Sequence, residues 1–200
     1  MPGSPRTTAV VLTPDCFSQG RVRVPPGVWL SFQRYLRPPG SVGRPLPPSL
    51  GALPLGIGVS GELLVPLADD EACWIGLELS PPVLRLRLTL ALDTGEGEWL
   101  DAFSGRSWHA GLPAEITLPG TLRIPGQRLA DGRTAAFARP RGDAAGRLRL
   151  RLFCAADALQ ADVFALSIGM VCYPAFSAEC GLLAPSRIDA AAGYKGWRLP

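Results

Sequence analysis

The stretch VLRLRLTLAL, residues 83–92, decides the fold, because a leucine fills every second position from Leu84 onward. Successive side chains of a β-strand point to opposite faces of the sheet, so these leucines share one face and the residues between them share the other. The same alternation returns in GRLRLRLF, residues 146–153. Each stretch predicts a strand with one apolar face turned to a core and one face that bears arginine.

Short segments of similar pattern recur along the chain, separated by glycine and proline. The 23 glycines and 21 prolines among 200 residues disfavour long helices, because proline lacks the helical N–H donor and both residues are typical of turns. The further predicted strands are Arg21–Val24, Val28–Leu36, Glu62–Leu67, Ala72–Leu79, Glu115–Leu118, Thr121–Ile124, Leu129–Phe137 and Val163–Tyr173.

The segment from residue 157 to residue 173 is ambiguous. Leu159, Val163 and Leu166 would suit one face of a helix, whereas every second residue from Phe164 onward is apolar, as in a strand. Gly169 and Pro174 favour the strand, with a helical turn before it as the alternative element.

These patterns predict an all-β protein, a single antiparallel β-sandwich of jelly-roll-like type with loops rich in Pro and Gly. We expect a loose lead-in over residues 1–13, the sandwich over 14–185 and an irregular tail over 186–200. Residues 37–58, RPPGSVGRPLPPSLGALPLGIG, are expected to form an ordered strap against the core, pinned by Leu46, Leu50, Leu53 and Leu55.

Charge and cysteine content restrict the partners and the compartment. A formal charge of +3 is too small to indicate a nucleic-acid binder, and no apolar run reaches the roughly 20 residues of a membrane-spanning helix. The cysteines are odd in number, show no C-x-x-C spacing and follow no recognisable secretion signal; they are Cys16, Cys73, Cys154, Cys172 and Cys180. We therefore expect a cytoplasmic protein with reduced thiols.

Several catalytic and cofactor motifs are weak or incomplete. GIGVSG, residues 56–61, matches the dinucleotide pattern G-x-G-x-x-G, but a helix must follow that pattern and Pro66 opposes one here. His109 is the single histidine, and Ser104 and Ser107 are too close to it in sequence for a Ser–His–Asp triad. We therefore predict no catalytic residues and no cofactor.

An acidic turn lies in DTGEGEWLD, residues 93–101. Clustered carboxylates on a β-loop can hold calcium, so Asp93, Glu96, Glu98 and Asp101 form a weak calcium candidate, although their spacing departs from the EF-hand loop. The same turn, together with Glu71 or Glu115, could supply the carboxylate pair of a carbohydrate-active hydrolase. No spacing favours either use, and we assign no metal site.

The arginines of the alternating strands allow two interpretations. Arginine opposite a leucine face is typical of a solvated surface. If the strands are neighbours in one sheet, the same residues instead form a basic face for phosphate or an acidic partner; these residues are Arg85, Arg87, Arg147, Arg149 and Arg151.

Tryptophans mark a candidate surface at one end of the sandwich. Trp29 and Trp74 lie in predicted strands and are expected in or near the core, whereas Trp99, Trp108 and Trp197 lie in loop-like sequence. Exposed aromatic residues are typical of binding surfaces. We therefore expect a ligand or partner surface there, built from Trp99, Asp101, Trp108 and His109.

Four segments resemble an uncharacterised family of bacterial proteins. Residues 43–79 are similar to a Pro-Leu-Pro-Pro-x-Leu-Gly strap followed by a Glu-Ala-x-Trp strand, and residues 91–112 to a hairpin that ends in Thr-Gly-x-x-Trp. LRIPGQRLADG resembles a Val-Pro-x-Gln-x-x-x-Asp-Gly stretch, which adds Gln127 and Asp131 to the candidate surface, and GLLAP resembles a Gly-Leu-Ala-Pro motif. The resemblance implies an intracellular β fold and no particular activity. The chain departs from the family where TAAFARPRG and AAGRLRLRLF replace a polar Arg-Gln segment and a His-Gly-Gly turn.

Taken together, these features favour a non-catalytic β-sandwich module that binds a protein partner or assembles as a homo-oligomer. The alternatives are the carboxylate-based hydrolase and the anion-binding sheet. We expect no membrane span and no nucleic-acid partner, and the sequence leaves open whether a small-molecule ligand binds.

Overall fold

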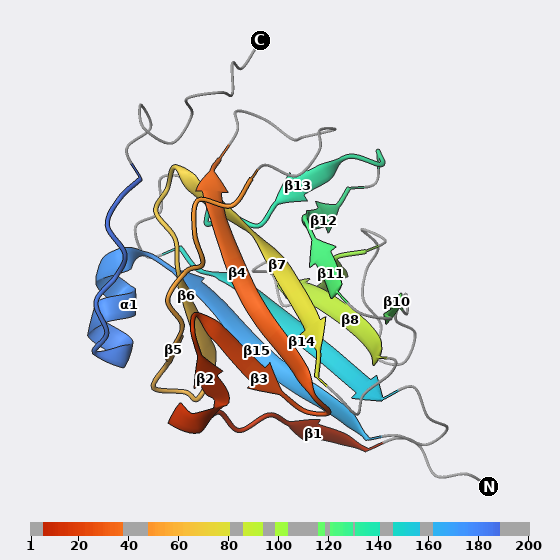
Figure 1. Cartoon of the computed structure of the whole chain (residues 1–200). Helices are drawn as coiled ribbons and strands as arrows, with labels where there is room; N and C mark the ends of the chain where they lie inside the picture. Colours follow the sequence, from red (N-terminus) through yellow and green to blue (C-terminus); the bar gives the residue numbers. More distant parts are fainter. Residues whose placement is uncertain are drawn as a thin grey trace, which may run out of the picture.

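The computed structural model describes residues 6–37, 48–80, 86–93, 99–103, 116–118, 121–129, 131–140, 146–156 and 162–188. These segments are mostly β-strand, with one short α-helix and one 3-10 turn, η1 (Pro14–Cys16) (Figure 1). The expectation of a mainly β protein is thereby confirmed. None of the helices in the described ranges is long and apolar enough to cross a membrane.

The larger sheet, sheet A, has eight strands. Its order is β10-β8-β14-β15-β6-β5, with β1 also beside β15 and β9 beside β8. The strands are β1 (Thr7–Ala9), β5 (Gly56–Ile57), β6 (Leu63–Pro66), β8 (Leu86–Asp93), β9 (Trp99–Asp101), β10 (Ile116–Leu118), β14 (Leu148–Ala156) and β15 (Val163–Val171).

Sheet A is mixed, which corrects the expectation of purely antiparallel pairing. The neighbours β8, β14 and β15 are antiparallel, but β1 and β6 both run parallel to β15. Alternation reports only which face a side chain occupies and not the direction of the neighbouring strand, so the sequence pattern could not reveal these two pairings.

The second sheet, sheet B, has five strands in the order β11-β7-β4-β3-β2. All of its pairs are antiparallel, and the longest runs over nine residues of both β4 and β7. The strands are β2 (Phe17–Ser18), β3 (Arg21–Val24), β4 (Val28–Leu36), β7 (Glu71–Leu79) and β11 (Thr121–Ile124). In Figure 1, β4 and β7 lie in front of β14 and β15.

One hydrophobic core joins the two sheets. From Leu150 to Cys154 every second residue of β14 is buried, and Leu150 is 1% exposed, as the alternation predicted. Sheet A contributes Leu63, Val65, Leu88, Leu90, Leu150, Leu152, Leu166 and Ile168 to this core, and sheet B contributes Val22, Leu30, Phe32, Cys73, Ile75 and Leu77. The opposite face of β8 departs from expectation, because Thr89 and Ala91 on that face are also buried.

A short ribbon replaces one predicted strand. Leu129–Phe137 was expected to be continuous, but β12 (Gly126–Arg128) pairs with β13 (Thr134–Ala136) across a turn. The reason is the Asp-Gly pair in the middle: Asp131 Oδ1 accepts the Arg133 N–H at 2.9 Å, and Gly132 has a φ of +82°.

One helix was not expected at all. The helix α1 (Tyr173–Cys180) begins one residue before Pro174, which was interpreted as a breaker. The helix tolerates this proline because it occupies the first turn, where no N–H donor is required. Gly181 ends the helix in the left-handed conformation with a φ of +69°. Its buried Phe176 packs with Leu64 and Val171 on the outer face of sheet A.

Described residues of the strap and of the lead-in pair with the two sheets. Leu53 and Leu55 are buried as predicted and Leu50 is half-buried, while Leu46 lies outside the described residues. Thr7–Ala9 in the expected loose lead-in forms β1. The GIGVSG stretch forms a hairpin between β5 and β6, so a strand follows the glycines and not the helix that the dinucleotide motif requires.

Candidate functional site

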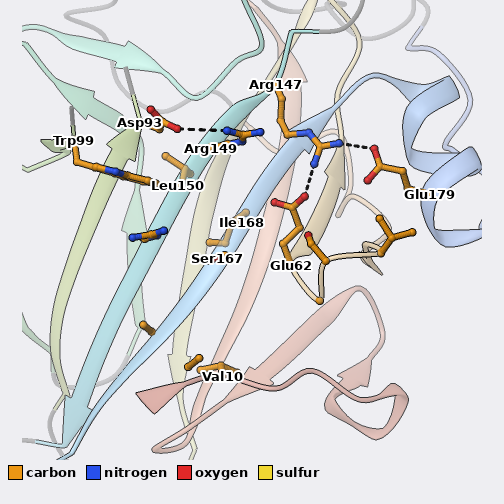
Figure 2. A pocket seen from close by; sticks show the side chains of 16 residues that line it. Val10, Glu62, Asp93, Trp99, Arg147, Arg149, Leu150, Ser167, Ile168 and Glu179 are labelled. Atoms are coloured by element: carbon orange, nitrogen blue, oxygen red, sulfur yellow. Dashed lines mark hydrogen bonds and ion pairs between the residues drawn. The ribbon is translucent and has the colours of Figure 1, made fainter. Parts of the chain in front are cut away.

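A groove of about 820 Å³ lies on the outer face of sheet A, the face turned away from the core (Figure 2). Ligand pockets in proteins commonly hold about 300–1,000 Å³, so the groove is large enough for a short peptide segment or a small molecule. The residues that line it are Ala9, Val10, Val59, Ser60, Gly61, Glu62, Asp93, Trp99, Arg147, Arg149, Leu150, Arg151, Ala165, Ser167, Ile168 and Glu179.

One end of the groove is a closed ion-pair network. Arg147, just before β14, pairs with Glu62 through one guanidinium nitrogen and with Glu179 of α1 through another, and Figure 2 shows it between the two carboxylates. Glu62 can reach Arg147 because position 169 has no side chain: a Cβ there would lie 3.0 Å from Glu62 Oε2. Arg147 is therefore engaged in holding α1 and the hairpin turn to sheet A.

The next arginine of the row has a looser partner. Arg149 Nη1 lies 3.8 Å from Asp93 Oδ2, at the long end of ion-pair distances, and the Arg149 side chain is 61% exposed. An exposed pair at this distance contributes little stability, so the guanidinium can exchange Asp93 for a ligand at small cost.

The third arginine is held by an aromatic ring. The Arg151 guanidinium lies over Trp99, 4.6 Å from the centre of the ring. Trp99 was expected in a loop, but it is the first residue of β9, and the pairing of β9 with β8 sets its position beside Asp93. A guanidinium stacked on a ring keeps its N–H donors free at its edge, where they can bind a carboxylate or phosphate in the plane of the group.

The structure brings together part of the predicted basic face. Arg149 and Arg151 share the outer face of β14 and lie beside Trp99. The basic face and the tryptophan surface, which the sequence analysis treated as separate candidates, therefore meet here. Arg87 does not join them, because it lies opposite Ala155 near the other end of β14. Arg85 lies outside the described residues.

Only part of the surface that was expected around Trp99 lies within the described residues. Trp108, His109 and Trp197 lie outside the described residues. Asp101 is buried and accepts the Phe103 N–H at 3.0 Å. Gln127 lies in β12, and Asp131 makes the turn after it; neither residue lines the groove.

The other two tryptophans lie on the outer face of sheet B. Trp29 and Trp74 were expected to be buried or half-buried and are half-buried there, and each ring carries an arginine: Arg21 lies over Trp29 and Arg123 over Trp74. Arg21 also binds Glu78, so these side chains satisfy one another across the sheet.

The hydrolase candidate Glu71 is a buried structural group. Its side chain is 1% exposed and accepts hydrogen bonds from the Tyr173 hydroxyl at 2.6 Å and the Ala68 N–H at 3.1 Å. Arg34 lies within ion-pair distance and also donates to the Ser186 carbonyl oxygen. Burial and the Glu71 carboxylate raise the pKa of Tyr173 well above its usual value. The cluster ties β4 and β7 to α1 and the segment that follows it.

Within the described ranges, no three His, Cys, Asp or Glu side chains are grouped closely enough to hold a metal ion. Two members of the weak calcium candidate, Glu96 and Glu98, lie outside those ranges. Asp93 and Asp101, the other two, contact Arg149 and the Phe103 N–H respectively.

All five cysteines are free thiols. Burial raises the pKa of Cys154 to about 12, and burial followed by the nearby Glu71 charge raises the pKa of Cys73 well above its usual value. Because the thiolate is the reactive form, these two cysteines are unreactive core residues.

Comparison of the chain with models of protein families, with curated proteins and with solved structures finds no match in any of the three.

Several residues of the groove were not predicted from the sequence. Glu62, Glu179 and Ser167, and also Gly169, whose missing side chain makes room for Glu62, come from three different elements or turns, and their roles depend on contacts between residues far apart in the chain. The only local signal is Gly169 within an apolar strand, which indicates a close approach of another group.

Proposed function

We propose that this protein is a non-catalytic binding module and that the groove on sheet A holds an acidic segment of a protein partner. The observation that carries the proposal is the pair of neighbouring guanidiniums, Arg149 and Arg151, which face solvent in a preformed groove. In the part of the chain that the structure describes, Arg151 has no carboxylate within ion-pair distance and Arg149 has only the distant Asp93.

The charge balance of the groove supports a protein segment over a nucleic acid. Three arginines line it, but so do three carboxylates, Glu62, Asp93 and Glu179. A nucleic-acid strand carries a phosphate charge about every 3.4 Å and would meet these carboxylates as well as the arginines. A ligand with a few separated charges avoids that repulsion.

The carboxylate-based hydrolase finds less support. Glu71 belongs to sheet B and Asp101 to sheet A, and each accepts hydrogen bonds in a buried setting. A glycosidase needs its two carboxyl groups on either side of one bond, about 5–10 Å apart and open to substrate. The contacts of Glu71 and Asp101 assign both of them to structure.

The proposal includes the domain extent, the compartment and the assembly that the sequence predicts. We take residues 14–185 as one sandwich domain of jelly-roll-like type, in which the shared core of sheets A and B provides a rigid support for the groove. Free thiols at all five cysteines favour a reducing compartment, the cytoplasm. The resemblance to the uncharacterised bacterial family, and assembly as a homo-oligomer, remain hypotheses.

The test is binding of an eight-residue peptide that carries four glutamates among four serines, measured by isothermal titration calorimetry at low salt. The double variant R149Q/R151Q should bind about tenfold more weakly, because two partly exposed charge pairs of about 0.7 kcal/mol each are lost. Arg23 is exposed on β3 of the other sheet, so R23Q removes a like charge without touching the groove and should leave the affinity unchanged. Equal affinity of the double variant and the wild type would contradict the proposal.

A further inference from the structure

The arginines of the groove form a row with a fixed spacing. Arg149 and Arg151 are two positions apart on one strand face, and two residues of a strand advance the chain by about 7 Å. Arg147 continues the row at one end, but Glu62 and Glu179 already occupy it. The row therefore presents two available guanidiniums at one strand repeat.

The surface beside this row leaves room for a chain. Ser167 of β15 lies opposite Arg151, and Ala165 lies two positions along the same strand. Both line the groove, and both have short side chains. Trp99 bounds the groove on one side, and the exposed Val59 of the hairpin turn also lines it. An extended backbone can therefore lie along β14 over small side chains, with apolar contacts at its edges.

An extended peptide has the same repeat as the strand below it. Its alternate side chains point to one face at intervals of about 7 Å, and the residues between them point away. Acidic residues at alternate positions would thus place successive carboxylates over Arg149 and Arg151. Neighbouring acidic residues would instead place one carboxylate toward the groove and the next toward solvent.

We propose that the groove recognises an extended segment in which acidic residues occupy every second position, bound along β14 with successive carboxylates on Arg149 and Arg151. This inference rests on the proposed function and adds to it the spacing of the ligand's charges. The carboxylates of Glu62, Asp93 and Glu179 act against a denser charge, so the spacing and not only the total charge determines the affinity.

The test compares two labelled peptides of equal composition and charge, Ser-Glu-Ser-Glu-Ser-Glu-Ser-Glu and Glu-Glu-Ser-Ser-Glu-Glu-Ser-Ser, by fluorescence anisotropy at low salt. In the second peptide no two glutamates are two positions apart, so one molecule cannot occupy both arginines at the strand repeat. The alternating peptide should bind about threefold tighter, the effect of one additional partly exposed charge pair of about 0.7 kcal/mol. R151Q should abolish this preference and R23Q should leave it intact.

The other possible results separate a failure of the spacing inference from a failure of the proposed function. Equal binding of the two peptides, lost for both in R149Q/R151Q, would overturn the spacing inference and leave the proposed function standing. If neither peptide binds, both proposals fail. Displacement of the alternating peptide by inorganic phosphate at the peptide's own concentration would also overturn the inference, because a single-anion site would then explain the binding.

Discussion

Three alternate arginines, one just before β14 and two within it, have three different environments. Arg147 is closed in by Glu62 and Glu179, Arg149 is exposed with a distant partner, and Arg151 is stacked on Trp99. Alternation predicted that all three point away from the core, because it depends only on the strand repeat. It could not predict their partners, which come from β8, β9, the hairpin turn and α1.

Glu71 gives a prediction at the same scale. Glu71→Gln should lower the free energy of unfolding by about 2 kcal/mol, because a buried carboxylate that accepts hydrogen bonds from Tyr173 and Ala68 and pairs with Arg34 is replaced by a neutral amide. Chemical denaturation measures the change. The matched control is Glu78→Gln, which removes an exposed carboxylate paired with Arg21 and should cost less than about 0.5 kcal/mol. Equal losses in the two variants would show that the Glu71 cluster is not structural.

The buried thiols give a pH prediction. The pKa of Cys154 is raised to about 12 from an ordinary value near 9, so at pH 9 only about one Cys154 side chain in a thousand is thiolate in the folded protein. Brief treatment with iodoacetamide between pH 7 and 9, followed by peptide mass mapping, should modify Cys154 and Cys73 far more slowly than the partly exposed Cys16 and Cys172. Modification of all four at similar rates would contradict the buried positions.

At the scale of elements, the sequence predicted the strands in which apolar residues occupy every second position. β3, β4, β7, β8, β14 and β15 lie within a few residues of the predicted strands. Elements that depend on turn chemistry or on distant partners were missed. The β12–β13 ribbon depends on the turn at Asp131 and Gly132, and β9 exists through its pairing with β8. The helix α1 was missed because Pro174 was interpreted as a breaker, although proline followed seven residues later by Gly181 is typical of a short helix with both ends marked.

The docking of α1 gives the prediction for this scale. A Cβ at Gly56 would lie 2.7 Å from Cys180 Sγ and 3.2 Å from a ring carbon of Phe176, so Gly56→Ala should push the helix from β5. We expect a loss of about 1–3 kcal/mol in the free energy of unfolding, the usual cost of overpacking, and faster hydrogen exchange in α1.

The control for this prediction is a double-mutant cycle with Cys180→Ala, which removes the sulfur atom that the new methyl group would contact. The double variant should recover part of the stability that Gly56→Ala loses. Strictly additive losses would show that the contact between Gly56 and Cys180 does not position the helix.

At the scale of the whole molecule, sheets A and B depend on each other, because a single core contains residues of both. The sequence indicated which leucines are buried, but the strand order β10-β8-β14-β15-β6-β5 could not be obtained from it, because alternation carries no information about neighbours. The groove could not be predicted from the sequence for the same reason. Its residues come from β1, the hairpin turn, β8, β9, β14, β15 and α1, and only the completed topology places them together.

The shared core predicts a single cooperative unfolding transition. Phe32 of β4 is fully buried in this core, so Phe32→Ala should cost about 3–5 kcal/mol. The loss should appear equally when unfolding is followed by tryptophan fluorescence and by far-UV circular dichroism. Two separate transitions in the variant would show that sheets A and B do not unfold as one unit.

The measurement that tests the central claim most directly is site-resolved NMR of the arginine Nε–Hε groups during titration with the alternating Ser-Glu peptide. The account predicts that the signals of Arg149 and Arg151 shift together with the indole N–H of Trp99, while those of Arg21, Arg23 and Arg123 on sheet B stay in place. Equal shifts on both sheets, or none on β14 at saturating peptide, would contradict it.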